Sequence, residues 1–283
     1  QTAVLVEKFD VDSLLDIVSR NRVTDLPLIA GMVFSIVERG RVPDAVRKSI
    51  AKVSVGGAAT PMDAKRALAE IFPKADVFEA YGQSESTDGV TMARHGSVFA
   101  KPGTIGRANP YVAVDVLRSD DSLAEVDEPG EIAIAGPTVM RGYYRDRKAT
   151  AAALRNGWLR TGDLGRRDGD GDLFLTGRAK ELIITGGENV SPVEVENVLR
   201  RHPDVADVAV LGTPHPRWGE QVTAVVVAAQ GAALDARALD AFARAHLAGF
   251  KKPRRIEFVD ALPRNAANKV QTSVLRDRLS RKV

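Results

Sequence analysis

The sequence contains no cysteine, which excludes a disulfide framework, a thiolate metal site and a cysteine nucleophile. Aromatic residues form only 5% of the chain, and charges of both signs are interspersed around a net charge of +3. A nucleic-acid-binding surface would instead need clustered basic residues with aromatic residues between them. The longest largely apolar run, Val222–Ala229, is strand-sized and far below the roughly 20 residues that span a bilayer. We therefore expect a cytoplasmic protein with no nucleic-acid partner and no integral membrane segment.

The rest of the composition is that of an ordinary globular protein. Of the 283 residues, 44% are hydrophobic and 27% are charged, which suits one large domain or a domain and a half. The first residues, Gln1–Glu7, lack an initiator methionine and the basic start of a signal peptide. Ala3–Val6 is predicted to be a strand that begins before the first residues of this sequence. We therefore interpret Gln1 as a position inside a longer chain and not as a natural N-terminus.

Three segments of the chain have different patterns. Residues 1–102 alternate strands with helices, which is typical of a parallel sheet covered by helices. Residues 103–178 are rich in glycine and turn signals, and they predict an antiparallel or barrel-like β region. Residues 179–283 combine helices and strands in a small α+β domain. There Ser191 is predicted to cap a helix, and Glu194 three residues later would complete a capping box.

Two motifs in the first segment each follow a predicted strand. Gly56–Ala59 consists of small residues, which let a ligand lie against bare backbone, although a tight strand–helix connection explains it equally simply. In Tyr81–Glu85 the Ser84 hydroxyl stands beside the Glu85 carboxylate. That pair suits a phosphate oxygen and its Mg²⁺, and a solvated polar loop is the alternative. The carboxyl ends of parallel strands form the ligand crevice of such sheets.

Later motifs are weaker when each is taken alone. Asp163 could accept hydrogen bonds from two ribose hydroxyls, but most turn aspartates form hydrogen bonds only with their own backbone. Arg178 could pair with phosphate or form an exposed salt bridge. Gly186–Gly187 could admit a thin extended ligand or simply close a hairpin. Lys269, in a polar loop before the last helix, could reach a developing negative charge, although most loop lysines are merely solvated.

The order of these motifs resembles the adenylate-forming superfamily, which includes acyl-CoA and aryl-CoA synthetases. The resemblance covers essentially the whole chain and rests on five elements, which are Tyr81–Glu85, Gly130–Tyr143, Thr161–Asp163, Gly177–Glu196 and Pro263–Lys269. It implies α/β plus α+β structure, namely the remainder of a large α/β plus β-barrel adenylation domain in residues 1–178. A small mobile α+β C-terminal domain would follow in residues 179–283. Trp218–Gln221 and Phe250–Arg254 are similar to the acyl-CoA ligase branch.

The family's activity would be ATP-dependent activation of a carboxylic acid, with a fatty acid as the expected substrate, followed by transfer of the acyl group to CoA. Glu85 would hold Mg²⁺, Ser84 would contact phosphate, Asp163 would bind ribose and Arg178 would contact ribose or phosphate. Lys269 would bridge the carboxylate and phosphate oxygens. The residues expected to contact ATP or CoA are Gly57, Ala58, Tyr81, Gly82, Gln83, Ser84, Asp163, Arg178, Gly186, Gly187, Trp218, Phe250, Lys252 and Arg254.

Lys180 is the family's pivot position, and rotation about it would exchange Lys269 for Gly186–Gly187 at the site. Two departures from the family stand out. Asn268 replaces the usual glycine, as in some aryl-acid ligases, and the Ser/Thr/Gly-rich phosphate loop is missing from the sequence. We therefore expect this stretch alone to fail pyrophosphate exchange. The alternatives are an aryl-acid CoA ligase, an enzyme that loads a carrier protein, and an incomplete chain that only binds nucleotide or CoA. A homodimer is one option for its assembly.

Overall fold

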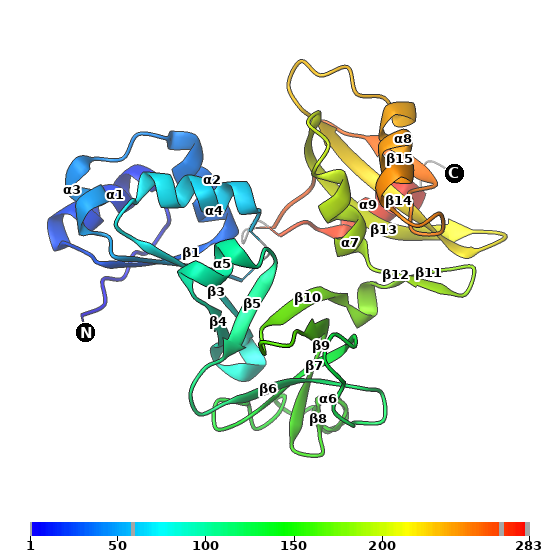
Figure 1. Cartoon of the computed structure of the whole chain (residues 1–283), viewed down its shortest axis with the longest axis horizontal. Coiled ribbons are helices and arrows are strands. Elements are labelled where there is room, and N and C mark those ends of the chain that lie inside the picture. Colours follow the sequence, from blue (N-terminus) through cyan, green and yellow to red (C-terminus); the bar gives the residue numbers. More distant parts are fainter. Residues whose placement is uncertain (1, 58–59, 266–268, 281–283) are drawn as a thin grey trace. The chain divides into compact units, whose positions relative to one another are not determined.

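The computed structural model describes residues 2–57, 60–265 and 269–280. The chain divides into two compact units (Figure 1). Unit 1 comprises Gln1–Thr161 and Gly165–Leu175, and unit 2 comprises Gly162–Leu164 and Thr176–Val283. The predicted domain boundary, after Arg178, lies close to this division. The short stretch Gly162–Leu164 was not expected to group with the second unit.

Unit 1 contains a sheet with the strand order β1-β2-β3-β4-β5-β10-β9-β7-β6, with β8 paired to β9. Its elements in chain order are α1 (Val11–Asn21), β1 (Asp25–Ile29), α2 (Ala30–Arg39), α3 (Asp44–Ser49), β2 (Lys52–Gly56), α4 (Met62–Ile71), β3 (Asp76–Gln83), η1 (Ser84–Ser86), β4 (Asp88–Ala93), α5 (His95–Ala100), β5 (Thr104–Ala108), β6 (Ala113–Leu117), β7 (Gly130–Ala135), α6 (Arg147–Ala153), β8 (Leu154–Arg155), most of β9 (Trp158–Arg167) and the start of β10 (Leu173–Arg178).

The first three strands are parallel, and helices of residues 11–71 supply most of the apolar residues packed on them. In β1 the side chains of Leu26 and Leu28 are buried, and Pro27 between them is exposed. Proline suits this position because β1 is the outermost strand of the sheet. Burial of alternate residues therefore fixes which face of the strand meets the helices.

Unit 2 is a smaller α+β unit with the strand order β12-β11-β14-β13, and β15 pairs with β14. Its elements are η2 (Ala179–Glu181), β11 (Ile183–Thr185), β12 (Glu188–Val190), α7 (Pro192–Leu199), β13 (Val205–His215), β14 (Gly219–Ala228), α8 (Ala236–His246), β15 (Arg255–Phe258) and α9 (Thr272–Ser280). The fold class predicted from the sequence, α/β plus α+β, is confirmed by these elements.

The long β13–β14 hairpin separates two apolar layers of unit 2. Val208 and Val210 point into the layer formed with α7 and α8. Ala209 and Leu211, their neighbours in the chain, point into the layer formed with α9. The strand is nearly continuous in apolar residues because both of its faces are covered.

Two local expectations were wrong. No strand forms at Ala3–Val6, where Leu5 is 92% exposed; a strand needs a hydrogen-bonded neighbour, and the described residues provide none there. Ser191 does cap α7, accepting a hydrogen bond from the Glu194 amide at 3.4 Å. The Glu194 carboxylate does not complete the capping box, because it binds the Lys251 ammonium at 2.7 Å and 2.9 Å.

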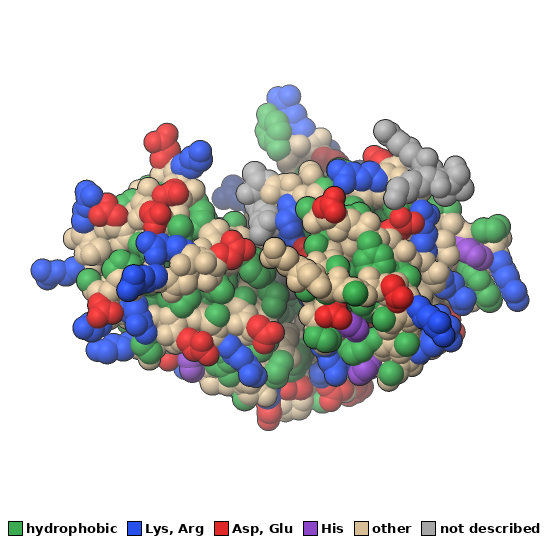
Figure 2. Space-filling view, turned by 90° about the horizontal axis from the view of Figure 1, so that it is seen from above, with side chains coloured by type: hydrophobic (Ala, Val, Ile, Leu, Met, Phe, Trp, Pro, Cys, Tyr) green, Lys and Arg blue, Asp and Glu red, His purple; other side chains and the backbone are tan. Residues whose placement is uncertain are grey.

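No helix in the described ranges is both long enough and apolar enough to cross a membrane. Figure 2 shows acidic and basic side chains interspersed over the face in view.

Candidate active site

The carboxyl ends of β2 and β3, which are neighbouring parallel strands, lead into the first two predicted motifs. Gly57 follows β2 with a φ of +77°, a conformation that favours glycine. A side chain at Gly56 would start 2.9 Å from the carbonyl oxygen of Ala80, so the two strand ends approach too closely for one. Ala58, the next predicted residue, lies outside the described residues.

The Tyr81–Glu85 motif forms the end of β3 and the short helix η1. Tyr81 is 8% exposed, Gly82 and Gln83 are half-buried, and Ser84 is exposed. The turn is closed by two hydrogen bonds, because Gln83 N donates to the Ser86 hydroxyl at 3.1 Å and that hydroxyl donates to Gln83 O at 2.9 Å. The main chain after β3 is therefore fixed by local bonds.

The Glu85 carboxylate has a partner, Tyr143, that its own motif does not reveal. The phenol of Tyr143 donates a hydrogen bond to Glu85 Oε1 at 2.9 Å, and this bond raises the pKa of Tyr143. The backbone of the same segment is attached as well, since Met140 N donates to Glu85 O at 2.7 Å. Tyr143 closes the Gly130–Tyr143 element, which was the one signal in the sequence that could have pointed to it.

The surroundings of Glu85 fit a magnesium ion that is also bound by phosphate. Mg²⁺ is usually held by one or two carboxylates together with water and substrate phosphates. Glu85 is half-buried and presents a single carboxylate beside the exposed hydroxyl of Ser84. This donor set suits shared coordination with a nucleotide and does not suit an all-protein metal cage.

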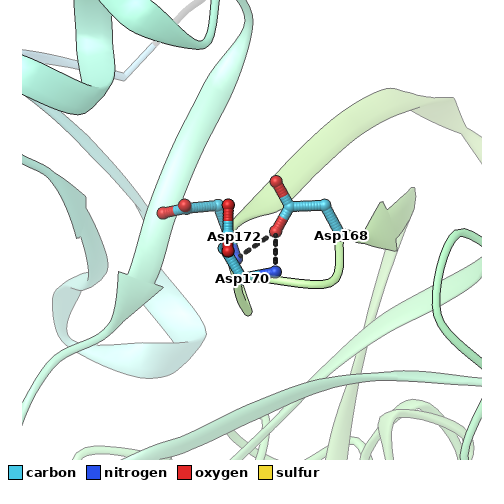
Figure 3. Close-up of side chains that lie close together, drawn as sticks. All are labelled: Asp168, Asp170 and Asp172. Atoms are coloured by element: carbon cyan, nitrogen blue, oxygen red, sulfur yellow. Dashed lines mark hydrogen bonds between the residues drawn. The ribbon is translucent and has the colours of Figure 1, made fainter.

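A second acidic group, not predicted from the sequence, lies at the turn between β9 and β10 (Figure 3). This three-aspartate cluster consists of Asp168, Asp170 and Asp172. The ammonium of Lys101 lies 2.7 Å from one oxygen of each carboxylate, and these hydrogen bonds raise the pKa of Lys101. A lysine side chain therefore fills the place that a cation would take. The cluster ties the end of α5 to the β9–β10 turn.

In unit 2, Asp163 and Arg178, both predicted to contact the nucleotide, lie together. Arg178 Nε is 2.9 Å from Asp163 Oδ1, and Asp163 is only 4% exposed. Asp163 stands on β9 directly after Gly162, which has a φ of +74°, and Arg178 ends β10. A buried carboxylate held by an arginine is fixed in direction, which suits recognition of hydroxyl groups.

Gly186 and Gly187 form the two-residue turn between β11 and β12. Their φ angles are +62° and +88°, as in a type I′ hairpin turn, where both central residues need φ > 0. A Cβ on Gly186 would lie 2.8 Å from the indole of Trp218, so the ring packs directly on this glycine. The turn is therefore bare backbone on the side that faces Trp218.

The predicted CoA-contacting residues Trp218, Arg254, Phe250 and Lys252 lie in three different environments. Two guanidinium groups make cation–π contacts with the indole of Trp218. That of Arg254 lies 4.9 Å from the ring centroid, and that of Arg217, which was not predicted, lies 4.7 Å from it. Phe250 instead packs on the apolar layer of α7 and α8. The ammonium of Lys252 is bound by Asp240 at 2.8 Å, so an anionic ligand would have to compete with that carboxylate.

Lys180 is exposed in η2, and Lys269 is exposed in the loop before α9. Asn265 closes this loop, because Lys269 N donates to Asn265 Oδ1 at 2.9 Å and Asn265 N donates to Lys269 O at 3.0 Å. Asn268 lies outside the described residues. The two hydrogen bonds with Asn265 fix the main chain at Lys269, whose side chain is exposed.

Comparison with known proteins identifies the family. Residues 1–144 match the model of the AMP-binding enzyme family, and residues 194–269 match the model of the AMP-binding enzyme C-terminal domain. The chain belongs to the AMP-binding enzyme family. The resemblance to adenylate-forming CoA ligases stated from the sequence is thereby confirmed.

Two curated relatives and one solved protein illustrate the match. Indoleacetate–CoA ligase of Aromatoleum aromaticum is 36% identical over 282 residues, which cover 99% of this chain and 55% of that protein. Long-chain-fatty-acid–CoA ligase of Bacillus subtilis is 36% identical over 270 residues, covering 94% and 48%. The o-succinylbenzoate CoA synthetase of B. subtilis, solved with its acyl-adenylate, has a TM-score of 0.82 at 34% identity, with 96% and 54% covered. The same enzyme has been solved with ATP and a magnesium ion. The chain spans about half the length of these relatives.

Proposed function

We propose that the protein activates a carboxylic acid with ATP and transfers the acyl group to CoA. The observation that carries this proposal is the buried carboxylate of Asp163, which the exposed Arg178 binds, in a member of the AMP-binding enzyme family. A carboxylate fixed by an arginine offers acceptor oxygens for the two hydroxyls of a ribose. The names of the relatives support the reaction class, since each of the three is a CoA ligase or synthetase.

The reaction would proceed in two steps. A carboxylate oxygen of the acid first bonds to the α-phosphorus of ATP, and pyrophosphate leaves. The thiolate of CoA then bonds to the carbonyl carbon of the acyl-adenylate, and AMP leaves. An acid with an ordinary pKa is already ionised at neutral pH, so the first step needs positioned charge more than a general base.

The exposed Lys269 is suited to supply that charge. Its ammonium would contact the carboxylate and phosphate oxygens during adenylation, where charge develops on both. On unit 1, Ser84 would contact phosphate, and Glu85, held by Tyr143, would bind Mg²⁺. A magnesium ion there would supply charge neutralisation for the phosphates. Gly57, Ala58, Tyr81 and Gly82 would line the adenine and acyl groove, and Arg178 would contact ribose or phosphate.

For the second step we propose rotation of the C-terminal domain, residues 179–283, about Lys180. This movement would withdraw Lys269 and bring Gly186–Gly187 to the reacting atoms. The bare backbone of that turn would let the pantetheine arm pass. Trp218 and Arg254 would meet the nucleotide part of CoA, and Phe250 and Lys252 would lie near it.

We propose an aromatic acid as the first substrate class to test. The indoleacetate and o-succinylbenzoate enzymes support it, and Asn268 is also found in some aryl-acid ligases. The second candidate is a fatty acid, which the Bacillus subtilis long-chain-fatty-acid–CoA ligase supports at the same identity. Loading of a carrier protein in place of CoA is tested in the same assay.

The test is exchange of radiolabelled pyrophosphate into ATP by the complete gene product, with a panel of aromatic and fatty acids. We expect Mg²⁺-dependent exchange with at least one acid, followed by release of AMP when CoA is added. A phosphopantetheinylated carrier protein replaces CoA in a parallel reaction. Acid-dependent formation of ADP, or exchange with no acid present, would contradict the proposal.

A further inference from the structure

The glycine turn between β11 and β12 is attached to the main sheet of unit 2 by a short ladder. Thr185 pairs with Gly219, and Gly186 N donates to the carbonyl of Trp218 at 2.9 Å. At the next rung in this register, Ile184 N donates to a side-chain oxygen, Oε2 of Glu220, at 3.0 Å. A carboxylate therefore serves as the ladder's acceptor two residues before the turn.

The position of this carboxylate depends on a glycine in the neighbouring strand. Gly212 lies on β13, and an ideal Cβ built there would be 2.6 Å, 2.8 Å and 2.9 Å from three atoms of the Glu220 carboxyl group. The carboxyl group thus occupies the space above Gly212 that the Cβ atom of any other residue would fill. The backbone at Gly212 is not in the left-handed region, so alanine could be accommodated there by movement of the flexible glutamate.

Because the Gly186–Gly187 turn has no side chains, its position is determined by its hydrogen bonds and by the packing of Trp218. We propose that Glu220 is a positioning residue for the second half-reaction: its carboxylate, seated over Gly212, fixes β11 and so holds the glycine turn where the CoA arm must pass. This inference rests on the proposed function. Glu220 itself is not expected to touch the substrates, and it has no role in the first half-reaction.

Two variants perturb the contact in different ways. Glu220→Ala removes the acceptor of the Ile184 amide. Gly212→Ala retains Glu220 but pushes its carboxylate away. Glu220→Gln is the conservative control, because its amide oxygen can still accept the same hydrogen bond. Gly96→Ala is the matched control for Gly212→Ala, since a Cβ at Gly96 meets nothing within 4 Å and its φ is ordinary.

Each half-reaction is measured separately in the complete gene product, by pyrophosphate exchange and by thioester formation from a supplied acyl-adenylate. We expect Glu220→Ala and Gly212→Ala to slow thioester formation about tenfold, the scale of one hydrogen bond, and to leave exchange unchanged. Hydrogen–deuterium exchange of peptides that cover residues 183–187 should be faster in both variants. Glu220→Gln and Gly96→Ala should resemble the wild type in every measurement.

The outcomes separate this inference from the function on which it rests. Unchanged thioester formation in both variants, or an equal loss in both half-reactions, would overturn the positioning role while acid-dependent exchange by the wild type still supports the proposed function. Slower thioester formation without faster amide exchange near Ile184 would overturn it as well. Absence of exchange in the wild type would instead contradict the proposed function.

Discussion

Replacement of Lys65 by methionine tests how the Gly56–Ala59 turn and the Tyr81–Glu85 motif are held together. Lys65 lies on α4 and forms an ion pair with Glu79 on β3, and the side chains are only 6% and 9% exposed. Burial raises the pKa of Glu79, and the Lys65 charge opposes this shift. The variant would leave a buried carboxylate without its cation.

Breaking a buried ion pair by removing one partner costs roughly 3–5 kcal/mol. In a unit of this size, each 1 kcal/mol lowers the melting temperature by about 2–4 °C. We therefore expect Lys65→Met to melt on the order of 6–20 °C below the wild type near neutral pH. The double variant Lys65→Met/Glu79→Leu replaces both charges by apolar groups and should recover most of this loss.

The pH dependence gives an independent check, with its sign set by Glu79. A carboxyl group whose pKa is higher in the folded state than in the unfolded state destabilises the fold as pH rises through that raised pKa. Loss of Lys65 raises the folded pKa of Glu79 further. The deficit of Lys65→Met relative to the wild type should therefore be largest near neutral pH and shrink towards about pH 5. The assay is thermal unfolding followed by circular dichroism at both pH values. A deficit that the double variant shares, or that does not change with pH, would refute the reasoning.

Two further changes test contacts that the sequence did not reveal. Tyr143→Phe removes the phenol that binds Glu85, so a Mg²⁺ titration of pyrophosphate exchange should show a requirement about tenfold higher, with thioester formation from supplied adenylate unaffected; an unchanged requirement contradicts a role for this pair. Lys101→Ala leaves the three-aspartate cluster without its cation, so the melting temperature should fall and recover in millimolar Ca²⁺, whereas the wild type should not respond. Equal responses to Ca²⁺ would contradict the account of Lys101.

The sequence was sufficient for features that are local or that recur in a fixed order. Strand–helix alternation predicted a parallel sheet covered by helices, which β1 to β3 form, and the ordered motifs predicted the family. Each of these depends on residue patterns that can be read along the chain.

The contacts that position the candidate site could not be predicted in this way. Tyr143 is 58 residues from Glu85 in the sequence, and Lys101 is separated from the three-aspartate cluster by 67–71 residues. Gly212 lies within a strand and carries no signal that a carboxylate covers it. Such pairings can be predicted only when the sheet order is known, because hydrogen-bond partners across strands have no fixed spacing along the chain. The predicted strand at Ala3–Val6 was wrong for a related reason, since apolar composition alone does not supply a partner strand.

The most direct test of the central proposal is Lys269→Ala, with both half-reactions measured in the complete gene product. The account predicts a loss of about a hundredfold or more in acid-dependent pyrophosphate exchange, the usual effect of removing one group that stabilises developing charge. Thioester formation from a supplied acyl-adenylate should remain close to the wild-type rate, because the proposed rotation would withdraw Lys269 for that step. An equal loss in the two half-reactions, with the variant folded, would contradict the assignment of Lys269 to adenylation.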